Sequence, residues 1–144
     1  MAKKAKEAPK PKLNLTVSGK RKTAIAKATI KAGTGLIRVN RKPLELYPQF
    51  QKLTLMEPIM IAEDVLKSKN FDIDVNVKGG GSESQAEAAR LAMAKSIVEF
   101  TKSLELKKAY LAYDRSLLVA DVRRKEMYKP GDSRARASRQ KSYR

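Results

Sequence analysis

The sequence contains no cysteine and no histidine in its 144 residues. A chain without cysteine has neither a disulfide framework nor a thiolate metal site. A chain without histidine lacks the commonest metal ligand and the usual general base of enzymes. The two absences argue against a metalloprotein and against most acid–base catalysts, and we expect no metal site and no cofactor.

Long apolar segments are also missing. No hydrophobic run approaches the roughly 20 residues that a membrane-spanning helix needs. Positive charge near the N-terminus is not followed by the apolar segment of a secretory signal. We therefore expect a cytosolic protein without a membrane partner, and 144 residues suit one domain with a modest core.

Positive charge is abundant and is concentrated at the two ends of the chain. The net charge of +17 divides into +11 for residues 1–41, −1 for residues 42–122 and +7 for residues 123–144. Solubility alone does not require this separation. A polyanion partner does, because each phosphate that is neutralised releases condensed counterions. The distribution therefore favours a nucleic-acid partner.

The same distribution predicts three parts. Residues 1–12 combine lysine, alanine and proline and are predicted to be a disordered basic arm, with an inert solubilising tail as the alternative. Residues 13–122 are predicted to form a globular α+β body. Residues 123–144 cannot bury enough apolar area to offset their ordering entropy. We expect them to form an extended basic tail that orders only on a nucleic acid.

The first third of the body is predicted to form a small sheet. A strand is expected at residues 13–17, a basic turn at residues 18–22 and a second strand at residues 23–32. A hairpin then leads to a third strand at residues 36–39. Seven cations would decorate this region without an intervening acid, which favours an RNA contact over an ordinary solvated face. They are Lys20, Arg21, Lys22, Lys27, Lys31, Arg38 and Arg41.

A helix and a strand are predicted in the middle of the chain. Thr54 and Glu57 match a capping box and predict a helix that begins at Thr54. Residues 71–78 alternate strictly between apolar and polar side chains and predict a half-buried strand. Asp72 and Asp74 lie on its polar side, and we interpret them as an acidic solvent face rather than a metal site.

Three consecutive glycines at residues 79–81 join this strand to an alanine-rich helix that is predicted to reach about Phe100. Ser82 and Gln85 are predicted to form the capping box of this helix. Its apolar stripe is predicted to extend to Leu104. Two interpretations stay open because they use the same geometry, namely a tight turn beside a closely packed helix or a contact with RNA phosphate.

The body is predicted to end in a short helix at residues 105–111 followed by an apolar segment that packs against the core. The buried members of this segment are expected to be Leu117, Leu118, Val119 and Val122. Local ion pairs are expected between Asp114 and Arg115 and between Asp121 and Arg123, and such pairs stabilise little when exposed.

Three segments resemble the universal S-nine family of small-subunit ribosomal proteins, in its archaeal or eukaryotic form. The first is Gly19-Lys20-Arg21-Lys22-Thr23-Ala24-Ile25-Ala26. The second is Gly79-Gly80-Gly81-x-x-Ser84-Gln85-x-x-Ala88-x-x-x-Ala92-x-Ala94-Lys95-Ser96-Ile97, which fits the family signature at every fixed position. The third is the basic end Lys141-Ser142-Tyr143-Arg144. The similarity runs from about Leu15 to Arg144, and its second motif is highly specific.

This resemblance implies an α+β fold of the ribosomal protein S-five domain-two-like type, with a left-handed β-α-β crossover. It also implies a cytoplasmic ribosomal location in the head of the small subunit, on the 3′ major domain of the rRNA and beside neighbouring ribosomal proteins. The tail would reach the peptidyl site, where residues 141–144 would touch the anticodon stem-loop of the tRNA. The chain departs from many bacterial members at Arg41, where they have glycine, and at Tyr143, which replaces a lysine.

The residues and the resemblance together predict two sets of contacts. The rRNA-binding set is Lys20, Arg21, Lys22, Lys27, Lys31, Arg38, Arg41, Gly79, Gly80, Gly81, Ser82, Gln85, Arg123, Arg124, Lys125, Lys129, Arg134, Arg136 and Arg139. The tRNA-binding set, which the resemblance alone implies, is Lys141, Ser142, Tyr143 and Arg144.

Two other functions compete with a structural role in the ribosome. A DNA-compacting protein would share the positive charge but would not require the glycine–helix motif. An enzyme that handles phosphorylated substrates at the glycine turn would need a nearby base or a metal triad, and the sequence offers no clear example of either. We therefore expect a structural RNA-binding protein rather than an enzyme.

Overall fold

A computed structural model describes residues 14–131 and 134–137 of the chain. Within these residues one sheet has the strand order β1-β2-β5-β3-β4. The strands are β1 (Leu15–Arg21), β2 (Ala24–Ala32), β3 (Ile37–Val39), β4 (Lys42–Pro43) and β5 (Phe71–Lys78). The helices are α1 (Gln49–Leu66), α2 (Ser82–Thr101) and α3 (Leu104–Tyr113), with 3₁₀ turns η1 (Leu44–Leu46) and η2 (Arg115–Leu117).

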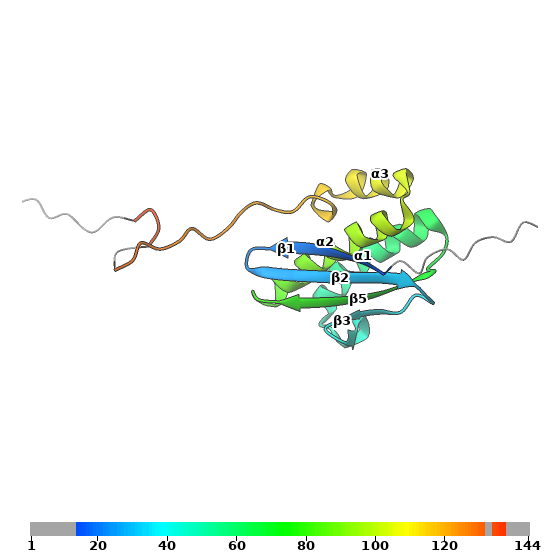
Figure 1. The fold of residues 1–144 in the computed structure, drawn as a ribbon, viewed down its shortest axis with the longest axis horizontal. Helices are drawn as coiled ribbons and strands as arrows, with labels where there is room; N and C mark the ends of the chain where they lie inside the picture. Colours follow the sequence, from blue (N-terminus) through cyan, green and yellow to red (C-terminus); the bar gives the residue numbers. More distant parts are fainter. Residues whose placement is uncertain (1–13, 132–133, 138–144) are drawn as a thin grey trace, which may run out of the picture.

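The sheet is mixed, and the helices cover one of its faces (Figure 1). β1, β2 and β5 pair antiparallel in that order, while β3 runs parallel to β5. β3 and β5 are therefore parallel neighbours joined through α1, which gives the predicted β-α-β connection. α2 lies across β1, β2 and β5, α1 packs beside α2, and α3 packs against α1. The arrangement confirms the α+β class.

Small residues allow α2 to approach the sheet closely. β2 contributes the fully buried Ala24, Ala26 and Ala28, and α2 contributes buried alanines of its own. Gly19 of β1 lies directly beneath the helix, because a Cβ at this position would be 2.4 Å from the carbonyl oxygen of Ala88. The predicted turn at residues 18–22 is therefore wrong. β1 continues through Gly19 to Arg21, and the hairpin turn consists of residues 22–23 alone.

Helix α1 begins earlier than the capping pattern predicted. It starts at Gln49, directly after the N-cap residue Pro48 (φ −53°, ψ 148°). Thr54 lies inside the helix, where its hydroxyl donates a 3.0 Å hydrogen bond to the carbonyl of Phe50 four residues earlier. The prediction of a helix start at Thr54 is wrong. A threonine hydroxyl can cap a helix or bond to a carbonyl inside one, so the sequence pattern did not decide between the two.

The end of the body also differs in part from the prediction. α2 stops where Lys102 adopts a left-handed conformation (φ 52°), and Ser103 caps α3, so Leu104 belongs to the next helix and is exposed. Leu117 is fully buried as expected. Val119 and Val122 are 45% and 87% exposed, so their predicted burial is wrong. The chain has already left the core at these positions and has begun to run along the surface.

Candidate nucleic-acid interface

The open face of the sheet carries its side chains in rows across the strands. The row nearest the β1–β2 hairpin places Lys20, Ile25 and Lys78 side by side on β1, β2 and β5. The next row contains Lys27 between Ser18 and Asn76. Lys78 was not among the predicted contacts, although the strict alternation of its strand already placed it on the polar side. Positive charge on this face is therefore densest at the hairpin end.

Acids neutralise the opposite half of the same face. Arg38 donates to Asp74 from the neighbouring strand, with Nε–Oδ1 and Nη2–Oδ2 distances of 2.9 and 3.3 Å. Lys31 pairs in register with Asp72. The seven predicted cations therefore do not form one uniform surface, because Arg38 and Lys31 face acids on β5.

Asp72 also fixes the loop that precedes β3. One of its carboxylate oxygens accepts the backbone N–H groups of Thr34, Gly35 and Leu36 at 2.9–3.1 Å. These hydrogen bonds, led by the one from Leu36, lower the pKa of Asp72. Asp72 and Asp74 lie on the open face of the sheet as predicted, but both carboxylates also have specific partners within the sheet region, which the sequence did not reveal.

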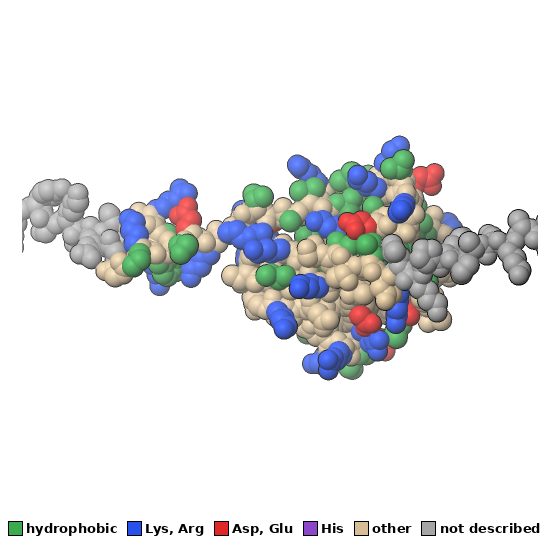
Figure 2. Space-filling model, viewed as in Figure 1, with side chains coloured by type: hydrophobic (Ala, Val, Ile, Leu, Met, Phe, Trp, Pro, Cys, Tyr) green, Lys and Arg blue, Asp and Glu red, His purple; other side chains and the backbone are tan. Residues whose placement is uncertain are grey.

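The hairpin end of the sheet meets the beginning of the tail. An open hollow of about 720 Å³ lies between them. Five of its lining residues are cations and none is an acid; these cations are Lys20, Lys22, Arg123, Arg124 and Lys125. Figure 2 shows Lys and Arg side chains gathered at the end of the body from which the tail leaves. We call this region, defined by the five cations, the basic end.

Arg41 belongs to the same end of the sheet but lies on the other side of β5. It is exposed and occupies the turn between β3 and β4, where both Asn40 and Arg41 have positive φ values of 50° and 64°. The side chain of Asn40 accepts a 2.7 Å hydrogen bond from the backbone of Val77 and ties this turn to β5. A left-handed backbone, as at Arg41, is adopted more readily by glycine than by other residues.

The glycine turn passes directly over the start of β2. A Cβ at Gly79 would lie 2.6 Å from the carbonyl oxygen of Thr23, and one at Gly80 would lie 2.9 Å from the Cβ of Ala24. Both residues have positive φ, at 76° and 69°. Close packing and backbone conformation thus require glycine at these two positions. Gly81 differs, because its φ is −96° and a Cβ there would meet nothing within 4 Å.

Side chains of α2 lock the turn in place, although not in the predicted pattern. Gly81 is the N-cap, and its backbone N–H donates to the hydroxyl of Ser84 at 3.0 Å. Gln85 reaches further back and donates to the carbonyl of Gly79 at 3.0 Å. The predicted Ser82–Gln85 capping box is therefore wrong by one residue. Ser82 is the first residue of the helix, so the N-cap is Gly81 and the N3 residue is Ser84.

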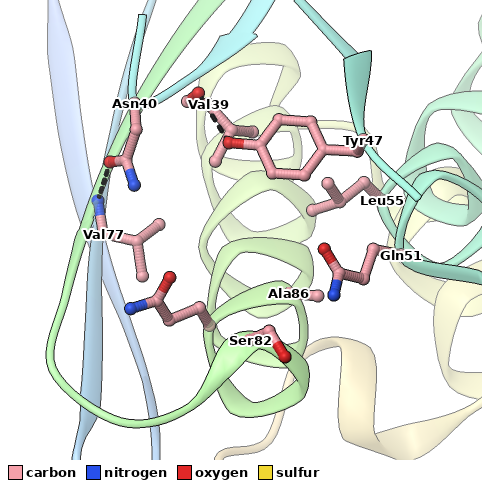
Figure 3. A pocket seen from close by; sticks show the side chains of 9 residues that line it. Val39, Asn40, Tyr47, Gln51, Leu55, Val77, Ser82 and Ala86 are labelled. Carbon is pink, nitrogen blue, oxygen red and sulfur yellow. Dashed lines mark hydrogen bonds between the residues drawn. The ribbon is translucent and has the colours of Figure 1, made fainter. Parts of the chain in front are cut away.

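A small pocket lies beside the glycine turn, between the ends of β3 and β5 and the first turns of α1 and α2 (Figure 3). Its walls include Tyr47, whose hydroxyl donates a 2.8 Å hydrogen bond to the carbonyl of Val39. Burial raises the pKa of this tyrosine. The volume is about 50 Å³, which is room for a few water molecules. We therefore interpret the pocket as a small packing gap beside the glycine turn, too small for a substrate.

Arg21 has partners within the chain. Its guanidinium pairs with Glu87 of α2 and with Asp121 at the end of the body, and its side chain is 18% exposed. The hydrogen bond to Glu87 is the main cause of its raised pKa. Local sequence patterns could not reveal this role, because the partners lie 66 and 100 residues away. The RNA contact of Arg21 stays a prediction.

The expected local ion pairs of this region are found in one case of two. Asp121 and Arg123 pair as predicted, with an Nη2–Oδ2 distance of 2.6 Å. Asp114 instead pairs with Arg90 of α2 at 2.9 Å and caps η2 through the backbone of Ser116. The predicted Asp114–Arg115 pair is thus replaced by a longer-range contact that holds η2 against α2.

The described part of the tail is exposed and partly turned back on itself. Arg123, Arg124, Lys125, Lys129 and Arg134 are all exposed. Arg136 donates to Glu126 at 2.7–3.1 Å, and residues 134–137 close a turn through a 2.7 Å backbone hydrogen bond. An extended backbone is therefore the wrong description for residues 134–137. The N-terminal arm at residues 1–12, Arg139 and residues 141–144 lie outside the described residues.

Taken together, the described surface carries exposed cations at the hairpin end of the sheet and along the tail, on a closely packed α+β body. Residues 19–144 match the family model described as ribosomal protein S9/S16. The chain is 56% identical over 129 residues to the small ribosomal subunit protein uS9 of Methanococcus maripaludis strain C7, covering 88% of this chain and 95% of that protein. It is 54% identical over 127 residues to the uS9 protein of Picrophilus torridus, covering 88% and 94%.

The chain therefore belongs to the ribosomal protein S9/S16 family. This finding confirms the resemblance that the three sequence motifs indicated, including its archaeal form, because the relatives named above are archaeal. No helix among the described residues combines the length and the apolar composition that crossing a membrane requires.

Proposed function

We propose that this chain is a structural constituent of the small ribosomal subunit in the cytoplasm and that it binds the rRNA of the subunit head, in the 3′ major domain. The observation that carries the proposal is the basic end, where cations from β1, the hairpin and the beginning of the tail line one hollow without an acid among them. Neutralising phosphates at such a site releases counterions and makes binding strongly dependent on salt.

The role is structural rather than catalytic. Family membership supports a ribosomal assignment. The close packing of Gly79 and Gly80 against β2 explains the glycines of this turn without a substrate-binding role. The DNA-compacting alternative relied on charge alone, so the family match favours the ribosomal role over it. The partners we propose are the small-subunit rRNA and neighbouring ribosomal proteins of the head.

The finer parts of the proposal concern the end of the tail and the fold. We infer that the connection from β3 through α1 to β5 is left-handed, as in the S-five domain-two-like fold. We also infer that the tail continues through rRNA toward the peptidyl site, where Lys141, Ser142, Tyr143 and Arg144 contact the bound tRNA. The direction in which residues 123–131 leave the body supports a tail that acts at a distance from it (Figure 1).

Deleting residues 141–144 is expected to weaken the retention of peptidyl-site tRNA by roughly tenfold or more at 0.1 M salt, because two cations and their phosphate contacts are removed. Incorporation into the small subunit should not change, because the basic end stays intact. The measurements are tRNA filter binding to purified small subunits and cosedimentation of the variant with the small-subunit peak on a sucrose gradient.

Deletion of residues 2–5 is the matched control, because it also removes four residues and two cations. It should change neither measurement. Unchanged tRNA retention in the 141–144 deletion would refute the tail contact. Failure of the full-length chain to cosediment with small subunits would refute the proposed function as a whole.

A further inference from the structure

Asp121 is an acid at the edge of the basic end, and it holds two arginines at once. Its Oδ1 accepts the backbone N–H of Arg123 at 2.7 Å, and its Oδ2 accepts the Nε and Nη2 groups of the same residue at 2.8 and 2.6 Å. The Oδ2 atom also pairs with the guanidinium of Arg21. One carboxylate therefore joins the last strand residue of β1 to the first residue of the tail.

The link continues into the body of the protein. Arg21 is mostly buried and pairs on its other side with Glu87 of α2. Glu87, Arg21, Asp121 and Arg123 thus alternate in charge from the helix, across β1, to the tail. The hydrogen bonds from Arg123 are the main cause of the strongly lowered pKa of Asp121, so its carboxylate stays ionised throughout the physiological range.

The position of this link determines where the cations of the tail lie. Arg123 and Arg124 line the hollow together with Lys20 and Lys22 of the hairpin. Like charges at this distance repel one another, and none of the residues lining the hollow is an acid. Asp121 and, more weakly, Glu87 offset this repulsion at Arg123, and Asp121 is the acid that contacts both Arg21 and Arg123.

We propose that Asp121 is a positioning residue for RNA binding, which strengthens the binding of an RNA backbone although it is itself an acid in a basic interface. By fixing Arg123 beside the β1–β2 hairpin, it preorganises the basic end as a cradle for consecutive phosphates. Preorganisation strengthens binding because the cost of ordering the site is met before the ligand arrives. This inference rests on the proposed function, since the ligand is the rRNA backbone.

The inference predicts the opposite sign from a charge-only account. If only net charge mattered, replacing Asp121 with asparagine would strengthen the binding of any polyanion, because the net charge rises by one. If Asp121 positions the tail, the same replacement should weaken binding. The direction of the change therefore separates the two accounts without any assumption about its size.

Glu126→Gln provides a matched control for Asp121→Asn. Each substitution removes one carboxylate that pairs with an arginine of the tail, and each raises the net charge by one. The difference is that Glu126 pairs with Arg136 within the tail, where both side chains are at least half exposed, and this pair links nothing to the body. Arg21→Lys is a second variant, which keeps the charge but loses the planar guanidinium that can bridge two carboxylates.

The first experiment compares the affinities of the full-length variants for a head-domain rRNA fragment at one salt concentration. Asp121→Asn and Arg21→Lys should each weaken binding by roughly three- to tenfold, which corresponds to about one lost phosphate contact. Glu126→Gln should bind as tightly as the natural chain or more tightly. Equal or tighter binding by Asp121→Asn would overturn the inference.

A second experiment uses the protein without RNA. Amide ¹⁵N relaxation should report increased mobility of residues 122–125 in Asp121→Asn and an unchanged profile in Glu126→Gln, while the melting temperature of the body stays within a few degrees in both. An unchanged profile in Asp121→Asn would overturn the anchoring role. Absence of salt-dependent rRNA binding by the natural chain would refute the proposed function. The relaxation profiles, which need no RNA, would still decide whether Asp121 anchors the tail.

Discussion

Replacing Gly19 with valine is expected to lower the free energy of unfolding by about 3 kcal/mol or more, which is at the upper end of overpacking effects. A Cβ at this position would lie 2.4 Å from the carbonyl oxygen of Ala88 and 2.7 Å from the backbone nitrogen of Ala92. Both are backbone atoms of α2, so no side-chain rotation can relieve the contact. The helix itself must move away from β1, and the buried alanine contacts that hold it would loosen with it.

Gly81→Val is the matched control, because the same atoms are added to another glycine associated with α2, namely its N-cap residue. Gly81 has φ −96° and open space around its missing Cβ, so the change should stay within about 1 kcal/mol. Urea unfolding followed by circular dichroism measures both variants, with the midpoint expected to shift at unchanged slope. A Gly19→Val variant within 1 kcal/mol of the natural chain would show that α2 does not rest on β1 as described.

Neutralising four cations of the basic end is expected to weaken binding to head-domain rRNA by roughly 10²- to 10³-fold at 0.1 M salt. The estimate follows from the counterions that about four phosphate contacts release. The variant replaces Lys20, Lys22, Arg124 and Lys125 with glutamine and leaves Arg123 with Asp121, so that the anchor of the tail is preserved. Each replaced side chain lines the hollow and is exposed. The body should therefore fold as before.

A second quadruple variant separates position from net charge. It replaces four exposed lysines of the helical side with glutamine, namely the C-cap residues Lys67 and Lys102 of α1 and α2, and Lys107 and Lys108 of α3. Both variants lower the net charge by four. Filter binding with a head-domain rRNA fragment should show less than a tenfold loss for this control. Equal losses in the two variants would mean that the protein attracts RNA by its overall charge and not through the basic end.

The sequence predicted those elements whose pattern is set by local burial. The alternation at residues 71–78 predicted β5 with its bounds, since one face of this strand is buried and the other is open. The alanine-rich run after the glycines predicted α2 to within one residue of its end. Both patterns repeat several times along the element, so one exceptional residue does not hide the period.

What the sequence analysis missed are mainly contacts between residues that lie far apart in the sequence. A glycine followed by three basic residues has the composition of a turn, but Gly19 is needed because α2 crosses β1 at that point. The RNA contact of Arg21 stays a prediction, but the sequence did not reveal that its guanidinium pairs with Glu87 and Asp121. Capping patterns were wrong for a different reason, because serine and threonine have several backbone groups within reach and the pattern does not select among them.

The candidate site was predictable in its composition but not in its extent. The sequence identified the cations of the hairpin and of the tail, yet it could not place them in one hollow or separate them from Arg38 and Lys31, which face acids on β5. Strand order decides that separation. β5 lies between β2 and β3, so its two aspartates meet the cations of both neighbours.

The central claim is that cations gathered at one end of the body and in the tail bind an RNA backbone, and the salt dependence of rRNA affinity tests it most directly. If about eight phosphates are neutralised, the logarithm of the affinity of the full chain for head-domain rRNA should fall with the logarithm of salt concentration with a slope of roughly −6 to −7. A slope near zero would contradict the claim.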